Sequence, residues 1–246
     1  MTRRLLLTVI GAAVLTSAAI AQTTPPLLSI ARVQVKPERM AEYLDIQKKF
    51  TEASKKSGGS LRYVLRGSEG NPNEVVIISG MNSYAEFDAE SPLLKAMTAA
   101  ESASLVARRG QCVVSVRTTV ERTLPENSLP ANMPVPKMVR EIRTRVRAGM
   151  QSQYLALVKS DLLPALKKLD VKVYRVRQVQ WGGPRTEFTS VSPMEKWSEL
   201  DLPANRLEGA MGKEAYAKYS EKMASIVAFS EYLIFTVVAD SSYRNQ

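Results

Sequence analysis

Two stretches of the sequence decide the fold: Glu74–Asp88 is EVVIISGMNSYAEFD, and Glu187–Asp201 is EFTSVSPMEKWSELD. They lie 113 residues apart along the chain. Five positions are identical in the two stretches: Glu74/Glu187, Ser79/Ser192, Met81/Met194, Glu86/Glu199 and Asp88/Asp201. Similarity at a fixed spacing is typical of an internal repeat. The sequence therefore predicts two copies of one structural unit.

The repeat continues on both sides of these stretches. At a spacing of 111 residues, Ile30–Leu44 aligns with Glu141–Leu155, with identities at Arg32/Arg143, Val35/Val146, Tyr43/Tyr154 and Leu44/Leu155. For the last strand we expect a spacing of 118 residues, which pairs Thr118 with Thr236 and Val120 with Val238. Because the matches keep their order along the chain, they indicate a duplication.

A proline-rich segment separates the two copies. Residues 123–137 contain Pro125, Pro130, Pro134 and Pro136. Since proline disrupts helix interiors and central strands, this composition predicts an extended, semi-rigid linker that runs outside both units. The predicted division of the chain is a signal peptide at 1–21, a first unit at 22–122, a linker at 123–137 and a second unit at 138–246.

The spacing of apolar residues gives the same order of elements in both units. Alternating apolar residues predict strands, and apolar residues at helical spacing predict helices. In the first unit we expect strands at Ile30–Lys36, Leu61–Arg66, Val75–Ser79 and Val113–Val120, and helices at 37–58 and 83–107. In the second unit we expect strands at Glu141–Val146, Val171–Gln178, Phe188–Val191 and Tyr232–Val238, with a helix at Gly149–Leu169 and another ending at Phe229. Ser83 and Glu86 predict a capping box at the start of the second helix.

This order of elements is the ferredoxin-like βαββαβ arrangement, and the predicted fold class is α+β. With it, the sequence resembles the dimeric α/β-barrel superfamily, in which two such units place their four-stranded sheets face to face. The resemblance implies that the two fused units form an intramolecular α/β barrel, present as a monomer or a weak homo-oligomer. One face of each sheet packs on its own helices, and the other face must also be covered.

The N-terminus is typical of a signal peptide. Arg3 and Arg4 precede the uncharged stretch Leu5–Ile20, and Ala19-Ile20-Ala21 fits a cleavage site. The apolar stretch is too short for a membrane anchor. We therefore expect an exported protein, periplasmic or extracellular, with no anchor after cleavage. Both the Sec and the twin-arginine routes fit the sequence.

The charge indicates the kind of partner, and the single cysteine excludes a disulfide within the chain. Cleavage after residue 21 removes two arginines and lowers the formal charge from +10 to +8. A positive protein favours anionic partners, but the charge is not gathered in a run of the kind that binds nucleic acid. Cys112 stands alone in an apolar run, so we expect a buried, inert thiol and no disulfide.

The sequence lacks the residues that many kinds of active site need. There is no histidine in the 246 residues, which excludes Ser-His and Cys-His nucleophilic sites, His-ligated zinc and proximal-His haem. No glycine-rich phosphate loop and no Cys or acidic cluster at metal-ligand spacing occurs. We expect no metal and no cofactor, and the sequence identifies no catalytic residue.

What remains is a row of basic residues on alternate positions of the predicted strands. Side chains two residues apart point the same way, so the first strand of each unit has a basic face opposite its apolar one. Guanidinium groups on such a face could hold an anion inside the barrel. The predicted ligand-binding residues are Arg32, Gln34, Tyr63, Arg143, Arg145, Tyr174 and Arg175. The alternative is that these arginines lie on a wet or edge face and pair with surface acids.

Three functions fit these observations. The first is a non-enzymatic binding module for a small, anionic organic molecule. The second, implied by the resemblance alone, is a cofactor-free monooxygenase-like enzyme acting on an aromatic or quinol-type substrate. The third is a structural or interaction protein whose barrel is filled by its own side chains.

The predicted cleavage site can be tested directly. We expect the exported form to begin at or near Gln22, because Ala19-Ile20-Ala21 fits signal peptidase. N-terminal sequencing of the protein recovered outside the cytoplasm measures this. A retained Met1 on that form would contradict the prediction.

Overall fold

The computed structural model describes residues 25–129, 135–201 and 203–245. The predicted signal peptide lies outside the described residues. The first unit consists of β1 (Leu27–Val35), α1 (Met40–Lys56), β2 (Leu61–Glu69), β3 (Glu74–Met81), α2 (Pro92–Ala96), α3 (Ala99–Cys112) and β4 (Val113–Thr123). The second consists of β5 (Met138–Val146), α4 (Gln151–Leu157), α5 (Leu163–Lys168), β6 (Arg175–Trp181), β7 (Glu187–Met194), α6 (Arg206–Met211), α7 (Lys213–Ile226) and β8 (Val227–Val237), followed by β9 (Tyr243–Arg244).

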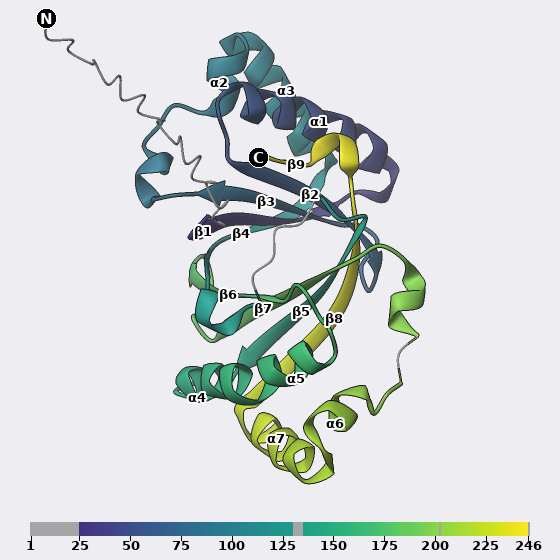
Figure 1. The fold of residues 1–246 in the computed structure, drawn as a ribbon. Coiled ribbons are helices and arrows are strands. Elements are labelled where there is room, and N and C mark those ends of the chain that lie inside the picture. Colours follow the sequence, from purple (N-terminus) through teal and green to yellow (C-terminus); the bar gives the residue numbers. More distant parts are fainter. Residues whose placement is uncertain (1–24, 130–134, 202, 246) are drawn as a thin grey trace, which may run out of the picture.

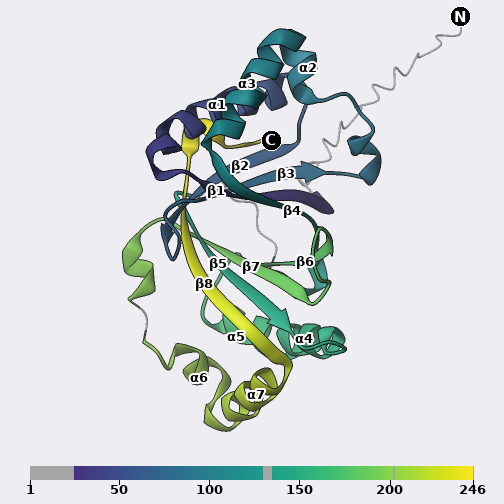
Figure 2. The ribbon, with the colours of Figure 1, turned by 180° about the vertical axis from the view of Figure 1, so that it is seen from behind.

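The strands close into one antiparallel barrel. Within the first unit they lie in the order β2-β3-β1-β4, and within the second in the equivalent order β6-β7-β5-β8. The two sheets join where β4 pairs with β6 and where β8 pairs with β2. This confirms the predicted intramolecular α/β barrel. Seen from behind, β8 runs from α7 of the second unit up to the first unit, along the seam between the sheets (Figure 2).

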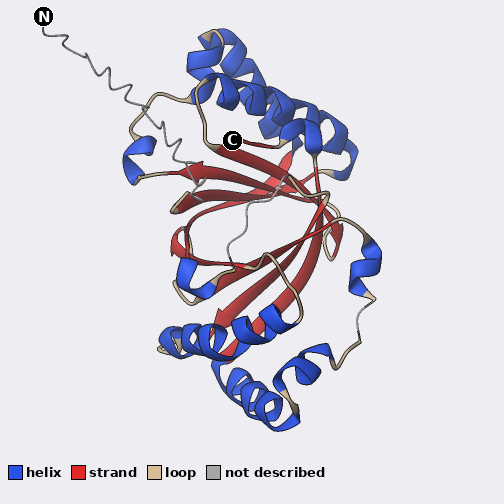
Figure 3. Cartoon of the chain, viewed as in Figure 1, coloured by secondary structure: helices blue, strands red, loops and turns tan. Residues whose placement is uncertain are grey.

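Helices cover the outside of the barrel, as Figures 1 and 3 show. One apolar core lies between α1, α3 and the first sheet, and includes Val35, Tyr43 and Cys112. A second core lies between α4, α5, α7 and the second sheet, and includes Val146, Tyr154 and Phe188. Val35/Val146 and Tyr43/Tyr154 are pairs of the repeat, so the duplication preserves the packing of helix on sheet.

The strand pairing corrects one alignment of the repeat. On the first strand of each unit, Arg32 lies opposite Arg117 and its equivalent Arg143 lies opposite Glu231. Arg117 therefore corresponds to Glu231, which is 114 residues later. The spacing of 118 residues that pairs Thr118 with Thr236 is wrong. Both strands are rich in β-branched residues, so an alignment shifted by a few residues gives similar matches.

The predicted second helix is interrupted in both units. Ser83 makes no side-chain cap, and only a short 3₁₀ turn, Tyr84–Phe87, follows it. The capping box lies instead at Thr98, whose hydroxyl accepts from the N–H of Glu101 at the start of α3. In the second unit a 3₁₀ turn and the short α6 likewise precede α7. The predicted helix at 149–169 is continuous apart from a π turn at Val158–Leu162.

Cys112 is buried, as predicted. Its side chain is fully covered at the end of α3, and its thiol donates to the carbonyl of Arg108 at 3.4 Å. Burial and the neighbouring Glu42 raise the pKa of the thiol, so the reactive thiolate is disfavoured.

The first part of the predicted linker is a folded tail rather than a spacer outside both units. After β4 the chain makes a 3₁₀ turn at Pro125–Asn127, and the N–H of Leu129 donates to the carbonyl of Tyr174 at 2.7 Å. Leu129 is buried in the core of the second unit. The tail after β8 repeats this: a 3₁₀ turn leads to β9, which pairs with the start of β2. Each unit therefore extends its tail onto the other.

This crossing can be tested at Leu129. Replacement by alanine should lower the free energy of unfolding by about 2–5 kcal/mol, because a buried leucine leaves a cavity. Leu94→Ala is the control, since Leu94 is 46% exposed on the short α2, and it should change stability by less than about 1 kcal/mol. Urea unfolding followed by circular dichroism measures both. Equal effects would show that the tail adds nothing to the core.

Candidate functional site

Strand alternation directs a row of charged side chains into the barrel. On β1, Val33 and Val35 pack against the outer helices, so Arg32, which has the opposite phase of the alternation, faces inward. On β5, Val146 packs outward, and Arg143 and Arg145 face inward. This orientation is the one that the period of two requires. Arg32 and Arg143 are mostly covered, whereas Arg145 lies at the rim with 54% of its side chain exposed and pairs with Glu187.

Inside the barrel these arginines meet two buried glutamates. The carboxylate of Glu141 accepts from Arg143 Nε at 2.8 Å, from Arg32 at 3.2 Å and from Arg177 at 3.3 Å. The carboxylate of Glu121 accepts from Arg32 at 3.4 Å and lies 3.4 Å from Arg177 Nε. We call these five residues the central ion cluster. It joins strands of both units.

The cluster is stable because its charges compensate each other. Burial opposes ionisation of Glu141, but the attraction of its three arginines outweighs burial and lowers the pKa of the carboxyl to about 2. Burial likewise disfavours the charged form of Arg143, but Glu141 and Glu74 outweigh it and raise the pKa of the guanidinium. Arg143 also donates to Glu74 at 2.9 Å and to Glu231 at 3.3 Å. The buried charges are therefore paired, as their burial requires.

The cluster separates two cavities. The polar cavity, of about 160 Å³, lies on the side of Arg32 and Arg143. Its rim carries Glu187, which accepts from both Arg117 and Arg145. Burial opposes ionisation of Glu187, but these two arginines outweigh it and lower the pKa of the carboxyl. Both positive and negative groups line this cavity.

The second cavity is mostly apolar. It has a volume of about 110 Å³ and lies on the side of Arg177. Its lining residues are Leu28, Leu61, Tyr63, Leu65, Ile78, Thr123, Pro136, Val139, Val173, Arg175, Arg177, Val191, Pro193 and Arg244. Three guanidinium groups and one phenol lie among the described lining residues, with no carboxylate. We call this the apolar cavity.

The structure distributes the predicted site residues between these places. Arg32, Arg143 and Arg145 line the polar cavity, whereas Tyr63 and Arg175 line the apolar cavity. Gln34 lines neither cavity, and its side-chain oxygen accepts from Asn71 at 2.8 Å. The predicted residues are therefore not one site but two groups on opposite sides of the central ion cluster.

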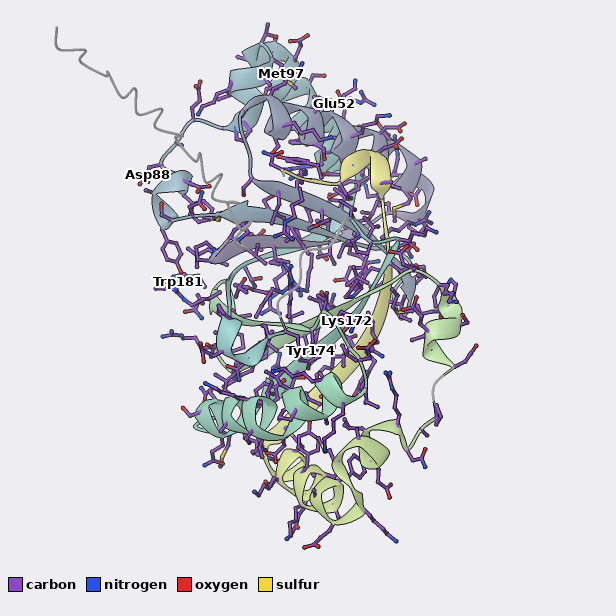
Figure 4. All side chains as sticks on the ribbon, viewed as in Figure 1. Glu52, Asp88, Met97, Lys172, Tyr174 and Trp181 are labelled. Carbon is purple, nitrogen blue, oxygen red and sulfur yellow. The ribbon has the colours of Figure 1, made fainter. Side chains whose placement is uncertain are left out.

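Tyr174 lies elsewhere. It is buried in the core beneath the helices of the second unit, opposite Leu129, and not in the barrel (Figure 4). Strand pairing makes Tyr63 equivalent to Arg175, and Arg62 equivalent to Tyr174. Arg62 also points outward and donates to Gln47 of α1 at 2.7 Å. The prediction that Tyr63 and Tyr174 lie in the same site was wrong. Their alignment is off by one residue, and a shift of one residue reverses the face of a strand.

The sequence did not reveal several residues of the central ion cluster and of the cavities. Glu141 takes the place of Ile30 in the repeat, and Glu121 takes the place of Phe235. A charged residue that replaces an apolar one at an inward position was the available signal. Arg244 lies on β9, which pairs only two residues of β2, so no periodicity reveals it.

The described part of the chain lacks two other kinds of feature. Over the described ranges, no group of three His, Cys, Asp or Glu side chains could hold a metal ion. None of the helices in the described part of the chain is long and apolar enough to cross a membrane.

Comparison with known proteins supports this architecture. Residues 26–89 match the family model described as antibiotic biosynthesis monooxygenase. An anthrone oxidase-like protein superimposes with a TM-score of 0.62 at 14% identity, over 88% of this chain and 92% of that chain. The first unit thus resembles a family of the dimeric α/β-barrel superfamily, and the whole chain has the fold of such a barrel in tandem form. No curated protein matches the sequence.

Two further solved structures show the same barrel. A proposed monooxygenase from Lactobacillus acidophilus NCFM matches this α/β barrel with a TM-score of 0.56 at 12% identity, over 90% of this chain and all of that chain. Chlorite dismutase from Candidatus Nitrospira defluvii, solved with imidazole, matches with a TM-score of 0.53 at 11% identity, over 87% and 92% of the two chains. At such identities the similarity concerns the fold.

The central ion cluster makes the stability of this α/β barrel depend on pH. Glu141 has an ordinary pKa near 4.5 in the unfolded chain and about 2 in the folded one. Its contribution is therefore complete above about pH 4.5 and is lost as the pH falls toward 2. We expect the urea midpoint to fall steeply between about pH 4.5 and pH 2, and Glu141→Gln to reduce that dependence.

At pH 7 the Glu141→Gln variant should be less stable by about 3–5 kcal/mol, because it leaves buried arginines without their shared carboxylate. Arg145→Gln is a matched control, since Arg145 is 54% exposed and contributes about 1 kcal/mol or less. A Glu141→Gln variant as stable as the parent would show that the cluster carries no net stabilisation.

Proposed function

We propose that this protein binds a small apolar molecule with an acidic oxygen in the apolar cavity and oxidises it with dioxygen, as a monooxygenase-like enzyme. The observation that carries the proposal is the composition of that cavity, where the guanidinium groups of Arg175, Arg177 and Arg244 lie among mostly apolar lining residues. The family match at residues 26–89 and the monooxygenase-like structural neighbours support the same reaction class.

The cavity favours the anionic form of such a molecule. Burial and the neighbouring Arg244 lower the pKa of Arg175. The two guanidinium groups therefore lie close together and are shielded from solvent. An enolate or phenolate oxygen beside Arg175 would be stabilised by these positive charges. The side chains of Leu61, Leu65 and Ile78 would pack on the ring system.

An electron-rich anion of this kind can react with dioxygen directly. For a substrate with an activated CH₂ group, loss of a proton to water gives the enolate, whose carbon forms a bond to one oxygen atom of dioxygen. Protonation of the resulting peroxide and loss of water leave a C=O group. The carbon is oxidised by four electrons, dioxygen accepts them, and the second oxygen atom leaves as water. Tyr63 is placed to donate a hydrogen bond to an oxygen in the cavity.

A non-enzymatic binding module is the second candidate. Glu121, Glu141 and Glu187 are each held by two or more arginines, which makes them poor proton acceptors for a substrate. This pairing favours binding without chemistry. A barrel filled by its own side chains is less well supported, since two cavities flank the ion cluster. For either function we propose that the protein acts after export, on the basis of residues 1–21.

Oxygen uptake distinguishes these candidates. With anthrone as the probe, we expect uptake of one dioxygen per molecule and formation of anthraquinone, faster than the reaction without protein. Arg175→Gln should lower kcat/KM about tenfold to a hundredfold, because a charge-assisted hydrogen bond is worth about 1.5–3 kcal/mol. Arg66→Gln is the control, since Arg66 is exposed on β2 and lines neither cavity.

Binding of anthrone without accelerated uptake would favour the non-enzymatic module. Absence of both binding and uptake for anthrone and for simple quinols would contradict the proposed substrate class.

A further inference from the structure

A guanidinium group with only neutral partners lies between α1 and the sheet of the first unit. Arg62 of β2 points outward, where its Nε donates to the hydroxyl of Thr51 at 3.1 Å and its Nη1 to the hydroxyl of Ser79 at 3.3 Å. Its Nη2 donates to the amide oxygen of Gln47 at 2.7 Å. Among the described residues, none of these acceptors is a carboxylate. Arg62 therefore differs from the arginines of the central ion cluster, whose charges are paired.

The surroundings of Arg62 make its positive charge costly. Burial lowers the pKa of Arg62 to about 10, the phenols of Tyr43 and Tyr243 oppose this shift, and the nearby Arg109 adds to it. The guanidinium is still charged at pH 7. Burial also raises the pKa of Tyr43 to about 12, so this phenol is neutral at pH 7 and does not balance the charge. A covered charge of this kind needs a counter-charge.

A second group at the same place lacks a partner. Gln47 of α1 is 1% exposed, and its amide nitrogen has no hydrogen-bond partner in the described part of the chain. Because the oxygen of the same amide accepts from Arg62, these N–H groups lie beside the guanidinium. Buried donors without an acceptor are rare in folded proteins. The amide and the guanidinium thus both require an acceptor, and the guanidinium requires a negative one.

The second unit has apolar residues at the equivalent place. Strand pairing makes Tyr174 equivalent to Arg62, and the repeat spacing of 111 residues makes Val158 equivalent to Gln47. Tyr174 and Val158 are both buried in the apolar core of the second unit. Helix and sheet can therefore pack here without a cation, so packing alone does not explain why the first unit has one.

The tail of the second unit encloses this place. Tyr243 pairs with Arg62 where β9 lies beside β2, beneath α1 (Figure 1). Thr51, which accepts from Arg62, donates in turn to the carbonyl of Ser241 at 2.9 Å. Tyr243 is buried and bonds the hydroxyl of Ser54 at 2.7 Å. Because helix, strand and tail surround the guanidinium, a ligand here must be small and must lose most of its water.

We propose that Gln47 and Arg62 bind a chloride ion between α1 and the first sheet. One negative charge balances one guanidinium, and a spherical ion can accept N–H groups from both side chains at once. A larger, doubly charged anion such as sulfate would fit neither the enclosure nor the charge. The site is independent of the proposed function, since Gln47 and Arg62 line neither cavity. Bound chloride would stabilise the junction of α1, β2 and the tail.

Thermal unfolding at constant ionic strength, with chloride in place of gluconate, tests the site. An ion that binds only the folded protein stabilises it, so chloride should raise the unfolding midpoint of the parent by about 3–8 °C. Arg62→Met removes the charge but keeps a long side chain, and its midpoint should agree within about 1 °C in the two salts. Gln47→Leu should respond as the parent does but need about tenfold more chloride, because one hydrogen bond to the ion is lost.

Arg66→Gln is the matched control, since Arg66 is exposed on the same face of β2, and it should respond to chloride as the parent does. An equal response of the parent and Arg62→Met would indicate a general salt effect and overturn the site. A parent that does not respond to chloride would also overturn it. Should Arg62→Met fail to fold, anomalous diffraction from parent crystals grown in bromide decides. A bromide peak beside the Gln47 amide supports the site, and a water molecule or no peak there overturns it.

Discussion

Charge neutralisation inside a closed barrel is the constraint on which this structure depends. Strand alternation turns a row of arginines inward, where an unpaired guanidinium would cost several kcal/mol. Glu141 and Glu121 meet this cost by accepting from three arginines that come from both units. The same contacts hold the two sheets in register and divide the interior, so that a charged polar cavity and a mostly apolar one coexist in a single barrel.

Departures from the repeat make this arrangement possible. In a perfect duplication, equivalent positions of the two units would hold the same residue. Here Ile30 is equivalent to Glu141, and Tyr63 is equivalent to Arg175. Instead, one unit supplies apolar groups where the other supplies charges. The cavity therefore has an apolar wall and a cationic wall. A pseudosymmetric scaffold has acquired a polarity that a symmetric dimer of identical chains could not have.

The sequence predicted the duplication, the order of the strands and the inward direction of Arg32, Arg143 and Arg145, because these follow from a spacing or a period. It did not predict the acidic partners of the arginines, since alternation gives the face of a side chain but not its neighbour across the barrel. Tyr174 was assigned to the wrong face because an error of one residue reverses a strand. Local patterns cannot place Arg244, whose position depends on a pairing between the two ends of the chain.

The reciprocal crossing of the tails has a consequence for how the protein folds. The barrel closes only when β8 pairs with β2, for example where Val237 lies opposite Leu65, and the tail after β8 then covers the edge of β2. Contacts so distant in sequence are formed late and at high cost in chain entropy. Neither unit has a complete core of its own, since Leu129 fills that of the second unit and Val238 packs against that of the first. We therefore expect a slow search followed by a single cooperative transition, in which two domains by sequence behave as one by thermodynamics.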